Sequence, residues 1–248
     1  SAQLYKNAAA VADLGEAGIT ELARQLENGG DPTRIKDAIS GFSFHATKAG
    51  RENWRSLATN SYGKALSSLS KPEAQFFLIT QLEQVGKDDA VIYLVPFLKD
   101  ERLSSDASRA LATINTESSK QSLLNALSAS GGQARVHLVQ ALGYTAFKPA
   151  TKSILQLANT DDQYLRKVCL HSLAQIGDVS AEPVLAAAAA KAGYTYENTE
   201  ATAAYLFLLN KLAVNGSTPL VTKKATALNQ LKKPEQLHTR IAGLKLLT

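Results

Sequence analysis

The side chains best suited to chemistry in this chain are four histidines and one cysteine. His45, His137, His171 and His238 are far apart in the sequence, and none belongs to an H-x-x-x-H motif or to a cluster with Asp or Glu at metal-ligand spacing. Lone histidines of this kind are typical of the surface or of contacts between helices. Cys169 stands where related segments carry small or apolar residues, which predicts a buried packing residue rather than a nucleophile. With no P-loop, G-x-S-x-G or G-x-G-x-x-G motif either, we predict no catalytic residue, no metal site and no cofactor.

Two carboxylates that precede an arginine have two interpretations. Asp161 and Asp162 could serve as a general acid and base. An Asp at a helix start can instead cap the helix and face Arg166 in a capping and inter-repeat ladder. We favour the ladder, because the pair directly precedes a helical segment.

Two tyrosines, Tyr194 and Tyr196, lie in a segment that is longer than the other turns. Tyrosines in such a turn are common binding anchors, so the 193–198 loop is a candidate recognition loop. The alternative is that both rings pack down over the neighbouring turn.

Composition and charge exclude several classes of protein. The chain has 248 residues and 45% hydrophobic residues, which is typical of a folded globular protein. Its longest apolar run, at 184–190, is far shorter than the roughly 20 residues that cross a bilayer. A single Cys excludes an internal disulfide.

The net charge is +5, and residues 201–248 carry seven Lys and Arg against one acidic residue, which invites a nucleic-acid interpretation. We favour a solvated face, or docking to a further domain.

The elements that must position these residues are helices, because apolar residues recur with helical spacing almost throughout. In the stretch 164–185, one helix ends at Gly177 and Pro183 opens the next. Aligned copies place Leu82, Leu111, Leu142 and Leu173 at equivalent positions, with offsets of 29, 31 and 31 residues. A period of about 30 residues with two helices per copy predicts an α-solenoid, in which stacked pairs bury a shared core.

The predicted architecture is an all-α, right-handed α-α superhelix of about six helical pairs in a single domain over residues 1–248. Residues 1–70 form a divergent N-terminal cap with helices at about 2–14, 17–28, 32–47 and 52–68; residues 71–191 are regular repeats; residues 192–248 are repeats with longer turns. The last segment leaves Ile241, Leu244 and Leu247 without a covering helix. We expect the chain to continue into a downstream domain. Self-capping or a homodimer through the C-terminal helix is the alternative.

The repeat unit resembles a known family. Arg166, Ser172-Leu173, Ile176-Gly177-Asp178, Ala181, Pro183 and Leu185 resemble the HEAT-like (armadillo-like) repeat of the phycobilisome-lyase type. Residues 31–54 with 72–114 look like the helical N-terminal region of exported Bacteroidetes-type proteins that carry a C-terminal 3-keto-disaccharide hydrolase-like domain. The resemblance implies an accessory region of a sugar-processing protein, exported or periplasmic rather than cytoplasmic.

The function that we expect is non-catalytic: a protein-interaction or scaffolding module for a protein partner or an attached domain. Second helices usually line the concave face of such solenoids. The expected contact residues are Lys120, Lys152, Gln156 and Lys223, with Tyr194 and Tyr196 of the loop. The alternatives are a DNA-binding base-excision enzyme of the HEAT-like glycosylase kind and a repeat-type lyase subunit. Nucleic acid is the less favoured partner, and no membrane span is expected.

Overall fold

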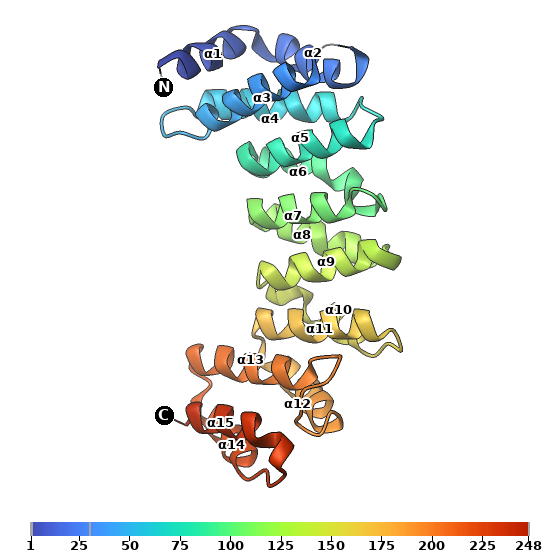
Figure 1. The fold of residues 1–248 in the computed structure, drawn as a ribbon, viewed down its shortest axis with the longest axis vertical. Helices are drawn as coiled ribbons and strands as arrows, with labels where there is room; N and C mark the ends of the chain where they lie inside the picture. The colour runs from blue at the N-terminus through green and yellow to red at the C-terminus, as the bar shows by residue number, and fades with distance from the viewer. Residues whose placement is uncertain (1, 30, 248) are drawn as a thin grey trace. The chain divides into compact units, whose positions relative to one another are not determined.

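Every regular element in residues 2–29 and 31–247, the part that the computed structural model describes, is helical (Figure 1). This part holds fifteen α-helices and four short 3₁₀-helices, and neighbouring helices pack against one another in pairs. The chain is therefore an all-α solenoid, as the thirty-residue period predicts.

The chain forms two compact units, which we call unit 1 (Ser1–Ala141) and unit 2 (Leu142–Thr248). The division falls inside helix α9 (Gly132–Tyr144). The predicted single domain over residues 1–248 stays a prediction.

Unit 1 opens with four helices whose bounds agree with the predicted cap to within a few residues. They are α1 (Ala2–Asp13), α2 (Gly15–Asn28), α3 (Pro32–Ala46) and α4 (Glu52–Leu66). Helix α3 begins where the sequence predicts, because Asp31 accepts a 3.0 Å hydrogen bond from the N–H of Thr33 and Pro32 stands at the first helical position. Helix α1 packs on α3 and α2 packs on α4, so successive pairs stack.

The regular repeats of unit 1 follow this cap. They comprise α5 (Pro72–Val85), α6 (Asp88–Leu94) with its extension η1 (Val95–Lys99), α7 (Ser104–Ile114) and α8 (Glu117–Leu127). The aligned residues Leu82 and Leu111 are fully buried, and so are Leu94 and Leu123 on the second helices. Because α5 packs on α7 and α6 on α8, each pair covers the apolar face of its neighbour. Burial in this shared core preserves the spacing while leaving the other residues free to differ.

Unit 2 continues the same pattern from the end of α9. Its helices are η2 (Lys148–Ala150), α10 (Thr151–Ala158), α11 (Gln163–Ile176), η3 (Val179–Ala181), α12 (Glu182–Lys191), α13 (Ala201–Val214), α14 (Thr218–Asn229), η4 (Pro234–Gln236) and α15 (Leu237–Lys245). Leu142 and Leu173 are fully buried on the first helices, and Ile154 and Leu185 on the second helices. The predicted alignment of repeats is therefore confirmed in this unit as well.

The turn between α11 and α12 forms as predicted, with one addition. Gly177 ends α11 in the left-handed region, at a φ of 68° that residues with a Cβ rarely adopt. Asp178 then accepts a 2.8 Å hydrogen bond from the N–H of Ser180, and Pro183 lies in the first turn of α12. The short helix η3 between them was not predicted, because three residues are too few to show a helical period.

Candidate functional site

The second helices of unit 2 carry two adjoining hollows. The first has a volume of about 760 Å³ and lies over η2 and α10. Lys152 and Gln156, two of the predicted contact residues, line it together because they are one helical turn apart on the exposed side of α10. Lys148 and Leu155 line the same hollow.

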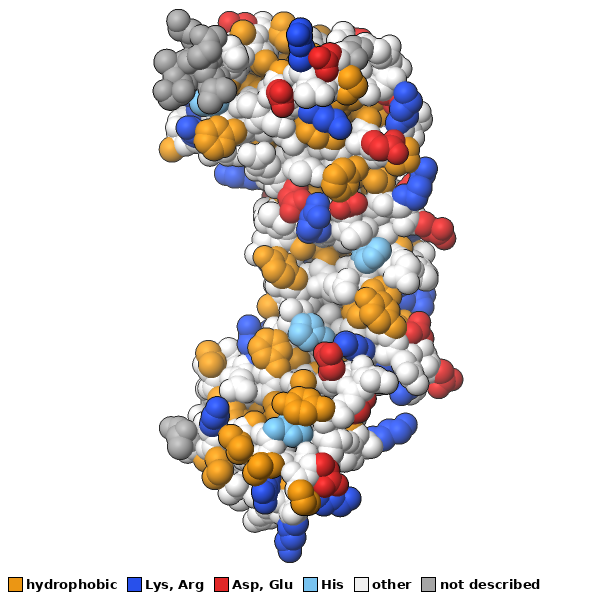
Figure 2. All heavy atoms as spheres, viewed as in Figure 1, with side chains coloured by type: hydrophobic (Ala, Val, Ile, Leu, Met, Phe, Trp, Pro, Cys, Tyr) orange, Lys and Arg blue, Asp and Glu red, His pale blue; other side chains and the backbone are white. Residues whose placement is uncertain are grey.

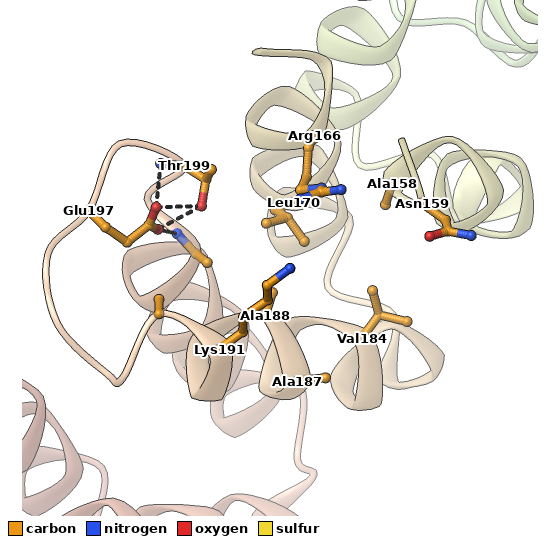
Figure 3. Close-up of a pocket in the computed structure, with 12 residues that line it drawn as sticks. Ala158, Asn159, Arg166, Leu170, Val184, Ala187, Ala188, Lys191, Glu197 and Thr199 are labelled. Carbon is orange, nitrogen blue, oxygen red and sulfur yellow. Dashed lines mark hydrogen bonds between the residues drawn. The ribbon is translucent and has the colours of Figure 1, made fainter. Parts of the chain in front are cut away.

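The second hollow, of about 530 Å³, lies between α11 and α12 (Figure 3). Two alanines from the run in α12, Ala187 and Ala188, line it. Arg166 from α11 and Lys191 from α12 both extend into it. Asn159, at the end of α10, lines both hollows, so the two adjoin there. We call the two hollows together the second-helix groove.

The acidic group of the groove is already engaged. Glu197 accepts hydrogen bonds from the hydroxyl and N–H of Thr199 and from the N–H of Ala201, at 2.6–2.7 Å (Figure 3). Burial opposes ionisation of this carboxyl, but these bonds, with the charge of Lys167, hold its pKa below the usual value. Glu197 is therefore an ionised cap on α13 rather than an acid that could donate a proton to a ligand.

The predicted ladder between Asp162 and Arg166 is half right. Asp162 caps α11 by accepting hydrogen bonds from the N–H groups of Tyr164 and Leu165, at 2.9 and 3.0 Å. The guanidinium of Arg166, however, donates to the main-chain carbonyl of Thr160 rather than to a carboxylate. The carbonyl is preferred because the turn before α11 places this unpaired oxygen within reach of the Arg166 side chain.

The tyrosine loop lies against the last helix of the unit. Thr239 of α15 donates a 2.8 Å hydrogen bond to the carbonyl of Tyr194, and Gln236 donates to the carbonyl of Gly193 at 2.7 Å. The Tyr196 ring stacks on His238 with centroids 3.9 Å apart and is still 76% exposed. Figure 2 shows pale blue His side chains beside orange hydrophobic side chains on the face in view. The loop is thus packed at its base and presents one exposed ring.

The remaining predicted contact residues lie elsewhere. Lys120 belongs to α8 of unit 1, where its Nζ lies 3.3 Å from a carboxylate oxygen of Glu117. Lys223 is exposed on α14. Only Lys152 and Gln156, of the six predicted residues, line one hollow together. Their role in binding stays a prediction.

Sequence reasoning missed three cations of the groove as site residues: Lys148, Arg166 and Lys191. A signal was present, because Lys148 precedes Lys152 by one helical turn and Lys191 directly follows the alanine run.

Sequence reasoning also missed a buried polar cluster that joins three helices of unit 2. The Glu182 carboxylate on α12 accepts a 3.0 Å hydrogen bond from the hydroxyl of Tyr205 on α13 and lies 2.9 Å from the Nζ of Lys224 on α14. Glu182 is only 5% exposed. Burial is the first cause that raises the pKa of Tyr205, and its bond to Glu182 adds to it, so its hydroxyl stays protonated as the donor. No pattern in the sequence brings these residues together, because their pairing depends on how consecutive repeats stack.

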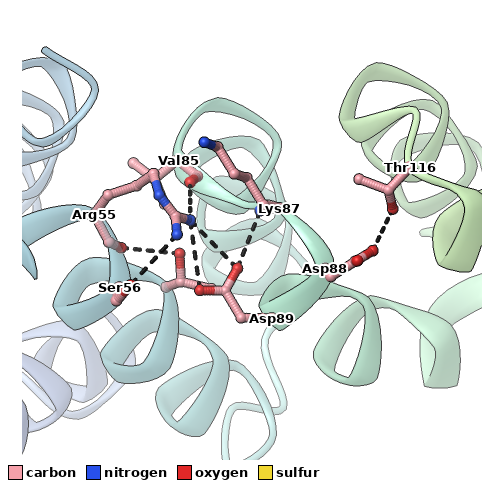
Figure 4. Close-up of polar contacts among 8 residues, drawn as sticks. Arg55, Ser56, Val85, Lys87, Asp88, Asp89 and Thr116 are labelled. Carbon is pink, nitrogen blue, oxygen red and sulfur yellow. Dashed lines mark hydrogen bonds and ion pairs between the residues drawn. The ribbon is translucent and has the colours of Figure 1, made fainter. Parts of the chain in front are cut away.

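A polar cluster in unit 1 has a similar structural role (Figure 4). The guanidinium of Arg55 on α4 donates to the carbonyl of Val85 at the end of α5 and to Asp89 of α6, at 3.1 and 3.3 Å. The hydroxyl of Thr116 at the start of α8 donates to Asp88. These bonds join the turns of successive repeats and occupy both carboxylates.

The histidines and the cysteine occupy structural positions. His137 lies 3.0 Å through Nδ1 from the hydroxyl of Ser104 on α7, and His171 stacks on Phe207 of the next first helix, so both are contacts between repeats, as predicted. Cys169 is buried, as predicted. Among the described residues no group of three or more His, Cys, Asp or Glu could hold a metal ion. Ser104 is fully buried, so its pairing with His137 does not make an accessible nucleophile.

These geometries can be compared with known proteins. Residues 121–205 match the family model for HEAT repeats. The match covers about a third of the chain and includes α10, α11 and α12, the helices that form the second-helix groove. HEAT repeats are generally non-catalytic modules that bind other proteins. No curated protein matches the chain. Within the described residues, no helix is long and apolar enough to cross a membrane.

Proposed function

We propose that the chain is a non-catalytic protein-interaction module that holds a protein partner or an attached domain against its second-helix groove in unit 2. The observation that carries the proposal is the placement of that groove on HEAT repeats, with Lys152 and Gln156 exposed in one hollow. Stacked repeats present a continuous row of second helices, so one partner segment can contact several repeats at once.

The experiment that tests this proposal selects short peptides from a displayed library against the purified chain and measures their affinity for variants. Gln156→Trp should fill the first hollow without changing its charge, and the selected peptides should lose about tenfold or more in affinity. Gln230→Trp is the matched control, since Gln230 is also exposed but lies at the end of α14, away from the groove. Failure to select any peptide, or equal loss in both variants, would contradict the proposal.

The tyrosine loop and the two outlying lysines are further proposed contact residues. Tyr194→Ala, Tyr196→Ala, Lys120→Ala and Lys223→Ala are to be measured with the same peptides. A residue whose replacement leaves every affinity unchanged is removed from the binding surface.

A finer proposal concerns the type of repeat and the kind of protein in which the chain acts. The motif Ile176-Gly177-Asp178 with Ala181 and Pro183 supports a HEAT-like repeat of the phycobilisome-lyase type. Its resemblance to exported Bacteroidetes-type proteins supports an accessory role in a sugar-processing protein. The coding sequence beyond Thr248 tests this: a β-rich sugar-active domain there would support it, and another kind of domain would contradict it.

A further inference from the structure

The second-helix groove combines small apolar side chains with unbalanced positive charge. We propose that it binds an acidic protein segment, one whose carboxylates alternate with small apolar residues. This inference rests on the proposed function and adds the chemical class of the partner.

The charge of the groove is the first support. Four cations line it, namely Lys148, Lys152, Arg166 and Lys191, against the single carboxylate of Glu197. Glu197 makes its hydrogen bonds within its own loop, to Thr199 and Ala201, and its one negative charge leaves the lining with a formal excess of three positive charges.

The positive excess is a property of the groove lining rather than of the surrounding segment. Asp178 stands near Lys148 and stays ionised, because hydrogen bonds from the hydroxyl and N–H of Ser180 lower its pKa, so it offsets part of the Lys148 charge. Asp162 is bound to the N-terminus of α11. Residues 142–200 together carry five Lys and Arg against six Asp and Glu, so the positive charge that a partner meets in the groove is that of the four lining cations. A partner that brings carboxylates would complement this charge.

The floor of the groove is the second support. Ala158, Ala187, Ala188 and Ala192 line the second hollow, and Leu155 lines the first. Short side chains let the backbone of a partner approach the helices closely, and covering them removes apolar surface from water. Small apolar residues on the partner fit this floor, while its acidic residues reach the cations at the edges.

A nucleic acid fits the same groove less well. Single-stranded nucleic acids are held by aromatic rings that stack on the bases, and no aromatic side chain is among the residues that line the two hollows. A duplex gains affinity from dense phosphate contacts, whereas much of this groove is apolar.

The experiment measures binding of a fluorescent peptide in which Glu alternates with Ala and Leu, beside the same peptide with Gln in place of Glu. The acidic peptide should bind and the neutral peptide should bind at least about tenfold more weakly. Lys152→Glu and Lys191→Glu should each weaken binding of the acidic peptide about five- to tenfold at low salt. Lys232→Glu is the matched control, because Lys232 is exposed in unit 2 but outside the groove.

Each outcome decides between specific alternatives. Equal binding of both peptides, or equal loss in the Lys232→Glu and groove variants, would overturn the acidic partner. The proposed function would survive that result if library-selected peptides still lost affinity in Gln156→Trp. Preferential binding of single-stranded or duplex DNA, lost in Lys152→Glu, would overturn the inference in favour of a nucleic acid.

Discussion

At the scale of single residues, the packing of three helices in unit 2 depends on one buried carboxylate. Glu182 makes its contacts with Tyr205 and Lys224, which belong to the two helices that follow α12 along the chain. A buried carboxylate is costly unless it is paired and hydrogen-bonded, so both partners are needed. The cluster therefore fixes how α12, α13 and α14 pack together.

Replacing Lys224 tests this dependence. Lys224→Met should lower the free energy of unfolding by roughly 2–3 kcal/mol, because it leaves the Glu182 carboxylate buried without its counter-charge. Urea denaturation followed by circular dichroism measures the change. Lys223→Met, one residue earlier and exposed, is the control and should change stability by less than about 0.5 kcal/mol. Equal changes in the free energy of unfolding of the two variants would show that the ion pair between Lys224 and Glu182 does not stabilise the fold.

His137 should make stability depend on pH. Burial lowers its pKa below the ordinary value for histidine, about 6.5, although the nearby Asp106 charge opposes the shift. The unfolded chain then binds a proton more readily than the folded one, so stability falls as pH falls from about 6.5 toward the folded pKa. His45, whose pKa is also lowered mainly by burial, contributes in the same direction.

The measurement is the unfolding free energy as a function of pH. His137→Gln should have a shallower slope than the parent below about pH 6.5, because one titrating group has been removed. Unchanged slopes would mean that His137 titrates alike in the folded and unfolded chain.

At the scale of elements, one glycine sets how closely two first helices approach. A Cβ on Gly143 of α9 would lie 2.6 Å from the Cβ and 2.7 Å from the Cα of Ser172 on α11. Gly143→Ala should therefore cost about 1–3 kcal/mol, despite the better helix propensity of alanine. Gly41→Ala is the matched control in α3, where no atom lies within 4 Å of the added Cβ, and it should stabilise by up to about 1 kcal/mol. Thermal unfolding of both variants would show opposite shifts, and a stabilising Gly143→Ala would contradict the close approach.

The sequence predicted these elements well where burial imposes a period. Leu82, Leu111, Leu142 and Leu173 revealed the repeat, because each must face the same core, and Asp31 and Gly177 marked helix ends through local hydrogen bonding and backbone geometry. The 3₁₀-helices were missed because segments of three to five residues are too short to show a helical period. The Arg166 contact was misassigned because a main-chain carbonyl leaves no trace in the residue types.

The candidate site was predictable only in part. The exposed side of α10 indicated Lys152 and Gln156, since both follow from helical spacing alone. The groove itself depends on how α10, α11 and α12 stack, which no local pattern specifies. The packing of the tyrosine loop on α15 likewise depends on residues some forty positions apart.

At the scale of the whole molecule, the uneven charge bears on the rival function as a DNA-processing enzyme. The excess of cations in the chain lies in residues 201–248, and the groove adds four lining cations to apolar walls that carry no aromatic ring. Such a surface attracts any polyanion at low ionic strength, but it retains only partners that also cover its apolar part. Salt should therefore separate an acidic peptide from DNA.

Measuring the affinities of DNA and of the acidic peptide at two salt concentrations decides between the two functions. Duplex DNA should bind weakly at about 50 mM salt and be lost by about 200 mM, since its affinity comes from released counterions. With rising salt, the acidic peptide should lose only the affinity that comes from its ion pairs with the four lining cations, and it should still bind at about 200 mM. Its apolar contacts with the alanine floor remain at that salt, because salt does not screen them. DNA binding that persists at about 200 mM, or release of a base from damaged DNA, would instead support the enzyme, because electrostatic attraction alone cannot produce either result.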